Sequence, residues 1–122
     1  MTDKETLGEG VVLDELLREA AADEAGALWR LTGAERQLDA NVVRLRPEAT
    51  VAEHVEPDLD VLVLGIAGAG TLHCGGVAHT LEPGVLRLLP RGAARGVSAG
   101  PEGVVYLTVH RRRPGLAIRP RP

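Results

Sequence analysis

The side chains best suited to chemistry lie in two short segments, residues 54–60 and 84–99. The first segment, HVEPDLD, holds an imidazole at His54 and carboxylates at Glu56 and Asp60. His54 and Glu56 are two residues apart, so both would lie on the same face of a β-strand. The second segment, GVLRLLPRGAARGVSA, contains Arg95, a cation that stays protonated and has no lone pair to give. Such groups could bind a metal ion or an acidic ligand, depending on how the fold arranges them.

Other reactive side chains give weaker signals. His73 and Cys74 are adjacent, so a strand would direct them to opposite faces, which argues against a metal site formed with His79. Cys74 is the only cysteine, so no internal disulfide can form, and no base is apparent near its thiol. Because no pair of nucleophile and base can be named, the sequence leaves open whether the protein is an enzyme.

Composition limits the classes of protein to consider. A chain of 122 residues is long enough for one domain with a single core. A net charge of −3 with mixed signs argues against nucleic acid or a membrane surface as the main partner. One cysteine fits a reducing compartment, no apolar run approaches the ~20 residues of a membrane span, and the first residues lack signal-peptide features. We therefore expect a cytoplasmic protein that binds neither nucleic acid nor membranes.

Residue periodicity predicts one helix followed by many short strands. An apolar stripe within residues 11–25, ending before Gly26, predicts a short helix that must pack against another surface. Fifteen glycines and eight prolines indicate many turns, and Cys74-Gly75-Gly76 predicts a hairpin. Strands are expected at residues 28–31, 41–45, 61–66, 71–73, 77–81, 85–89 and 104–109. This spacing is typical of an all-β sandwich or barrel.

The segment from residue 84 to residue 99 resembles the second sequence signature of the cupin family. Gly84, Pro90 and Gly92 match that signature in identity, while residues 54–60 match the spacing of the first signature. The resemblance covers residues 39–110 and implies an all-β fold, a cupin-type (jelly-roll) β-barrel with an N-terminal helical arm. We assign residues 1–26 to the arm with its short helix, residues 27–113 to the cupin β-barrel, and residues 114–122 to a basic C-terminal tail.

The same resemblance implies a site. His54 and Glu56 stand where the first cupin signature has two histidines, Asp60 stands for its glutamate, and Arg95 stands for the histidine of the second signature. If a metal such as Fe, Mn, Zn or Ni binds, its ligands would be His54, Glu56 and Asp60. A guanidinium at ~4 Å, however, opposes the ion by about 4 kcal/mol for each unit of its charge. We therefore expect no metal or other cofactor, with Arg95 paired to Asp60 or Glu56 in its place.

Two classes of function remain. The first is a small-molecule-binding cupin barrel of unassigned role, whose pocket contains His54, Glu56, Asp60 and Arg95. The alternative is a metal-dependent cupin enzyme, such as a dioxygenase, isomerase or lyase, that uses the first three of these residues. In both cases we expect a homodimer, like other small single-domain cupins of bacteria. With one Trp, one Tyr and no Phe, the core is poor in aromatic area. The apolar helical stripe and an edge strand also need to be covered by another surface.

Overall fold

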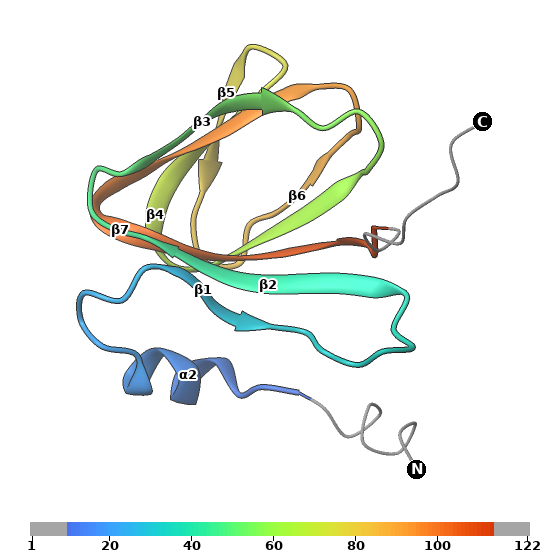
Figure 1. Cartoon of the computed structure of the whole chain (residues 1–122). Helices are drawn as coiled ribbons and strands as arrows, with labels where there is room; N and C mark the ends of the chain where they lie inside the picture. Colours follow the sequence, from blue (N-terminus) through green and yellow to red (C-terminus); the bar gives the residue numbers. More distant parts are fainter. Residues whose placement is uncertain (1–9, 114–122) are drawn as a thin grey trace.

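The structure is a computed structural model and describes residues 10–113. Along the chain the elements are α2 (Leu13–Glu19), β1 (Gly26–Arg30), β2 (Leu38–Leu45), β3 (Thr50–Val55), β4 (Val61–Cys74), β5 (Val77–Leu81), β6 (Leu86–Leu89) and β7 (Ala94–Arg111). The predicted all-β fold with a helix near its start is confirmed (Figure 1). The remainder of the expected arm, residues 1–9, and the expected basic tail, residues 114–122, lie outside the described residues.

The two longest strands, β4 and β7, belong to both layers of the barrel. Residues 61–68 of β4 pair with residues 104–110 of β7, and this layer continues to β6 on one side and to β2 and β1 on the other. Residues 70–74 of β4 pair with residues 95–99 of β7, and this second layer is completed by β5 and β3. All of these pairings are antiparallel. The two layers face each other (Figure 1).

The core is an aliphatic cluster built from the inward-facing residues of both layers. Its buried members are Val63, Leu72, Leu81, Leu89, Val97, Ala99, Val104 and Tyr106. They come from β4, β5, β6 and β7, where alternate residues point toward the interior. Tyr106 supplies the cluster's one aromatic ring, so the core depends on close packing of Leu and Val side chains rather than on large rings.

Glycines form the corner at which β4 and β7 pass from one layer to the other. The register between the two strands shifts twice, between Gly65 and Ala67 and again between Gly68 and Gly70. Gly68 has φ +68°, and a Cβ atom placed on it would lie 2.2 Å from the carbonyl oxygen of Gly103. Only a residue without a side chain fits this close approach of two backbones.

Four predictions about the elements need correction. The helix spans Leu13–Glu19 rather than residues 11–25, and Gly26 opens β1 instead of ending the helix. The strand β3 was not expected, because it pairs only with β7 and its residues are all exposed, so it shows no apolar alternation. Residues 61–66 and 71–73 form one strand, and the strand expected at residues 104–109 is only the last part of the longer β7. In both long strands, glycines that resemble turn signals mark bends in a continuous strand.

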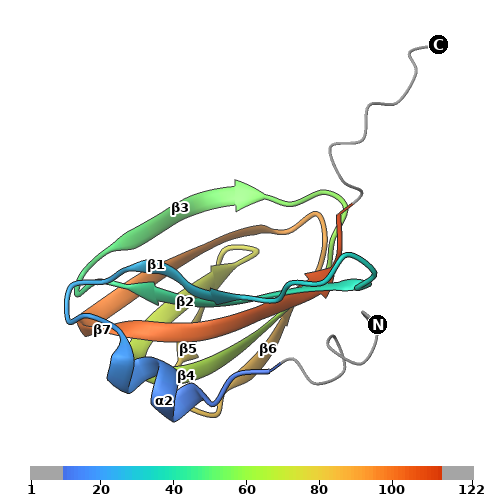
Figure 2. The ribbon, with the colours of Figure 1, turned by 60° about the horizontal axis from the view of Figure 1, so that its bottom comes forward.

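The helix lies on the outside of the layer that contains β1 and β2 (Figures 1 and 2). Arginines at the end of β2 fix the segment between α2 and β1. Arg44 Nη1 donates to the carbonyl oxygens of Ala21, at 3.1 Å, and Glu24, at 3.4 Å, and Arg46 Nη2 donates to that of Asp23 at 3.3 Å. Among residues 10–113 there is no helix with the length and apolar character needed to cross a membrane.

The corner glycine gives a first test of this architecture. We expect Gly68→Ala to lower the free energy of unfolding by at least about 2 kcal/mol, because it adds backbone strain at positive φ and a clash with the Gly103 carbonyl. Gly84→Ala is the matched control, since Gly84 has φ +86° but no atom within 4 Å of the position that a Cβ would take. Chemical denaturation of both variants measures the difference. Equal losses would show that the corner tolerates a side chain.

Candidate functional site

A cavity of about 180 Å³ lies between the two layers. Its apolar wall is formed by Val51, Val61, Val63, Leu72, Leu89, Val97 and Tyr106. Its polar groups are His54, Glu56, Arg95, Thr108, His110 and Arg113. Three of the four residues that the sequence singled out, His54, Glu56 and Arg95, therefore meet at one cavity, whereas Asp60 does not line it.

Arg95 is a buried cation in the wall of this cavity, with only 5 % of its surface exposed. Its Nε donates to the carbonyl oxygen of Ala93 at 3.2 Å, and its Nη2 donates to that of Pro90 at 2.6 Å. Its Nη1 is buried and, among the described residues, has no hydrogen-bond partner. A buried donor without a partner costs about 1–3 kcal/mol, and more when the group is charged. The guanidinium is thus held in place by two backbone carbonyls with one side left unsatisfied.

His54 reaches the same cavity because of an irregularity in β3. His54 pairs with Arg95 and Val51 pairs with Val97, so β3 has one more residue than β7 between these two pairs. This bulge places Val51 and His54, three residues apart, on the inward face. His54 Nδ1 lies 3.2 Å from the carbonyl oxygen of Ala52, and a carbonyl only accepts, so Nδ1 carries the hydrogen and Nε2 stays available.

Both carboxylate oxygens of Glu56 already accept hydrogen bonds from the protein. The backbone N–H of Asp58 donates to Oε2 at 2.9 Å, and Nη2 of Arg113 donates to Oε1. The hydrogen bond from Arg113, followed by that from Asp58, holds the pKa of Glu56 below its ordinary value of 4.5, and the charge of Arg95 acts in the same direction. Glu56 therefore remains ionised at neutral pH, and its charge is balanced mainly by Arg113.

Asp60 faces away from the cavity, and the expected pairing with Arg95 is incorrect. Its Oδ1 accepts a hydrogen bond from the backbone N–H of Arg91 at 2.8 Å, and its Oδ2 lies 3.3 Å from Arg91 Nη1. Both side chains of this pair are substantially exposed. Within residues 10–113 no ion pair joins Arg95 to Asp60 or to Glu56. The partner of Asp60 is therefore Arg91, in the turn between β6 and β7, and not Arg95.

Two residues of the cavity, Arg113 and His110, were not singled out by the sequence. Arg113 is the last residue assigned to the barrel, and only the fold brings it to Glu56. His110 continues the inward face of Tyr106 and Thr108, a two-residue spacing visible in the sequence, and it lines the cavity. Burial raises the pKa of Tyr106, so its hydroxyl stays neutral, and among the described residues it makes no hydrogen bond.

Comparison with solved structures identifies this arrangement of strands. The chain superposes on the cupin domain of Schizosaccharomyces pombe Cnp3 with a TM-score of 0.62 and 16% identity, covering 70% of this chain and 63% of that one. It superposes on TT1209 from Thermus thermophilus with a TM-score of 0.69 and 21% identity, covering 87% and 99%. The chain has the cupin fold. The fold predicted from the two signatures is therefore confirmed.

A third structure of the cupin superfamily is an enzyme. It is described as a sugar phosphate isomerase, SPO2919 from Silicibacter pomeroyi, and matches with a TM-score of 0.60 and 26% identity over 66% of this chain. This chain spans only 54% of the isomerase and 63% of the Cnp3 cupin chain. No family model and no curated protein matches this sequence.

Several contacts in the cavity oppose the binding of a metal ion of the usual kind. Within the part of the chain that the structure describes, no three His, Cys, Asp or Glu side chains are grouped so that they could hold one. Asp60 is turned to Arg91, both oxygens of Glu56 accept hydrogen bonds, and Arg95 places a fixed positive charge in the wall. A divalent ion would have to break these contacts and also withstand repulsion from Arg95.

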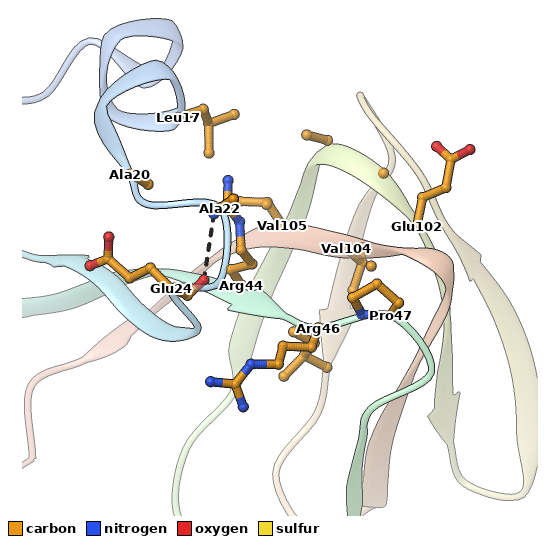
Figure 3. A pocket seen from close by; sticks show the side chains of 14 residues that line it. Leu17, Ala20, Ala22, Glu24, Arg44, Arg46, Pro47, Glu102, Val104 and Val105 are labelled. Atoms are coloured by element: carbon orange, nitrogen blue, oxygen red, sulfur yellow. Dashed lines mark hydrogen bonds between the residues drawn. The ribbon is translucent and has the colours of Figure 1, made fainter.

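A second hollow lies between α2 and the outside of the cupin barrel, with a volume of about 390 Å³ (Figure 3). Leu17 of the helix lies on one side and Val104 and Val105 of β7 lie on the other. Its arginines, Arg44 and Arg46, already donate to backbone carbonyls, one of them the Glu24 bond drawn in Figure 3. Since it holds no buried polar atom lacking a partner among the described residues, the interior cavity is the stronger candidate site.

The pairing of Glu56 with Arg113 can be tested by pH titration. We expect the pKa of Glu56, measured by NMR of its carboxyl carbon, to lie below 4.5 and to rise toward that value in Arg113→Ala. Because the folded pKa is lowered, the charge on Glu56 stabilises the fold above pH 4.5, and this contribution disappears as the pH falls through the folded pKa. A pKa that is unchanged by Arg113→Ala would contradict the assignment.

Proposed function

We propose that this chain is a small-molecule-binding cupin barrel that holds its ligand without a metal ion. The observation that carries the proposal is Arg95, which stands where the second cupin signature has a histidine and lies buried in the cavity wall with Nη1 unpaired among the described residues. A guanidinium has no lone pair for a metal, but it has donors for a ligand. The cavity thus offers the fixed positive charge of Arg95 in the place of a bound metal ion.

The state of the two carboxylates supports the same proposal. Asp60 neutralises Arg91 outside the cavity, and Glu56 neutralises Arg113 at its edge. Neither carboxylate is therefore free to balance a divalent ion next to Arg95. Removing a carboxylate from such a pair would leave its arginine uncompensated, which adds to the cost of metal binding.

A metal-dependent cupin enzyme is the second candidate. It is favoured by the two imidazoles of the cavity, since His54 and His110 both use Nδ1 on a backbone carbonyl and keep Nε2 available. The likeness to a protein described as a sugar phosphate isomerase also keeps an isomerase among the alternatives. This function requires metal binding, which makes the two candidates separable by experiment.

Metal binding by the wild type and two variants tests the proposal. We expect protein purified without chelator to contain no stoichiometric Fe, Mn, Zn or Ni, and added Mn or Zn not to raise its melting temperature. Arg95→His removes a positive charge and adds a lone pair beside His54 and Glu56, so metal should stabilise this variant, by about 2.7 kcal/mol at a hundredfold excess over the dissociation constant.

The matched control is Arg95→Met, which removes the charge without adding a ligand. It should gain less from metal than Arg95→His does. Stoichiometric metal in the wild type that is lost in His54→Ala would overturn the proposal and establish the metal-dependent alternative. If Arg95→His gains no more than Arg95→Met, then Arg95 does not occupy the metal position.

We also propose that the protein is a homodimer that buries the outer face of β4 and β6. Leu62 lies between the cavity-lining Val61 and Val63 and therefore points outward, directly opposite Leu88 of β6. The exposed fractions of Leu62, Leu86 and Leu88 are 43%, 63% and 56%. Large neighbouring apolar side chains on one face are typical of an interface, and a second copy offers the same apolar surface in a two-fold arrangement.

Sedimentation tests the dimer. We expect the wild type to sediment as a dimer at micromolar concentration and Leu88→Glu to shift it to a monomer, because a charge would be buried in the interface. Val77→Glu is the matched control: Val77 is 54% exposed but lies at the hairpin of β4 and β5, in the other layer. A monomeric wild type, or equal effects of the two substitutions, would contradict this assignment.

A further inference from the structure

The chemical class of the ligand follows from the groups that line the interior cavity, provided that the proposed metal-free binding function holds. Only 5% of the Arg95 surface is exposed. Its unpaired Nη1 belongs to the planar guanidinium that lines this cavity. Unpaired buried donors are rare, and a guanidinium matches the geometry of a carboxylate oxygen. Nη1 is itself covered, so an incoming oxygen requires a small movement of the side chains around it.

The charges of the cavity limit the charge of the ligand. Among the lining residues, Arg95 and Arg113 are positive, Glu56 is negative, and His54 and His110 are neutral in the usual formal count, so the sum is one positive charge. Glu56 forms an ion pair with Arg113, and Asp60 forms one with Arg91 outside the cavity. The uncompensated charge is therefore that of Arg95. A ligand with a single negative charge completes the balance, whereas a dianion would leave an excess of negative charge in a partly buried site.

The rest of the wall limits the body of the ligand. The volume of about 180 Å³ corresponds to roughly six water molecules and is below the usual range for drug-sized ligands. Opposite the polar rim the wall is aliphatic, with Val63, Leu72 and Val97 and the ring of Tyr106. Such a wall can pack against the hydrocarbon part of a ligand, but it leaves the hydroxyl groups of a sugar without hydrogen-bond partners.

We infer that the cavity binds a small monocarboxylic acid, with its carboxylate on the Arg95 guanidinium and its short apolar body against the aliphatic wall. The Nε2 atoms of His54 and His110 and the hydroxyl of Tyr106 are the further polar groups within the cavity residues that can contact it. Arg113 closes the rim through its bond to Glu56 and keeps that carboxylate from repelling the ligand.

Paired probes of equal shape test this inference. Isothermal titration of metal-free protein with isovalerate and benzoate is compared with titration of the uncharged isovaleramide and benzamide. We expect at least one of the acids to bind about tenfold to a hundredfold more tightly than its amide, as a hydrogen bond to a charged group would give. Arg95→Met should abolish this preference, while Arg91→Met, which alters an exposed arginine outside the cavity, should keep it.

Each other outcome has a separate meaning. If acids and amides bind equally to metal-free protein, the metal-free function stands and the assignment of a carboxylate is wrong. If the acids bind only after Mn or Zn is added, the proposed function itself is wrong. Failure of both acids to bind at tens of millimolar, or displacement of a bound acid by inorganic phosphate or glucose 6-phosphate, overturns the inference. The comparison of acid with amide in the wild type remains decisive even if Arg95→Met does not fold.

Discussion

The pairing of β4 with β7 is the contact on which the rest of the barrel depends. These strands run side by side through both layers, and every other strand except β1 pairs directly with one of them. Two strands can remain paired around such a corner only if their backbones approach more closely than side chains allow. Gly70 shows this as Gly68 does, because a Cβ atom placed on it would lie 2.6 Å from the carbonyl oxygen of Ser98 in β7. The glycine content of the chain is thus a condition for closing the barrel.

The same continuity assembles the cavity. β7 carries Arg95 in its first part and His110 near its end, fifteen residues apart in number, yet both line one space because the strand crosses from one layer to the other. β3 adds His54 through its bulge, and β4 contributes Val61, Val63 and Leu72 to the apolar wall. Since His54, Arg95 and His110 come from strands, the positions of their backbones are fixed by the ladder of hydrogen bonds between strands.

Of the three arginines in or next to the cavity, Arg91, Arg95 and Arg113, only Arg95 has no carboxylate partner among the described residues. Arg91 and Arg113 each have a carboxylate partner, and both of these pairs lie at the surface or at the rim. Arg95 has only backbone carbonyls, whose partial charges balance a full cation poorly in a partly dry cavity. A hydrophobic side chain there would serve the stability of the fold at least as well. This buried, incompletely satisfied cation is the physical reason for assigning the cavity a role in binding.

The sequence by itself determined the fold class, because glycine-bounded strands at short spacing and two ordered signatures are local features that survive folding. Three of the residues that it singled out, His54, Glu56 and Arg95, meet at one cavity. Only the tertiary structure decided which carboxylate pairs with which arginine. Asp60 and Arg91, like Glu56 and Arg113, are brought together by strand register and by the path of the chain after β7, and residue spacing does not encode either. Likewise β3, an exposed edge strand, has no periodic pattern to reveal it, because periodicity records burial and its side chains are not buried.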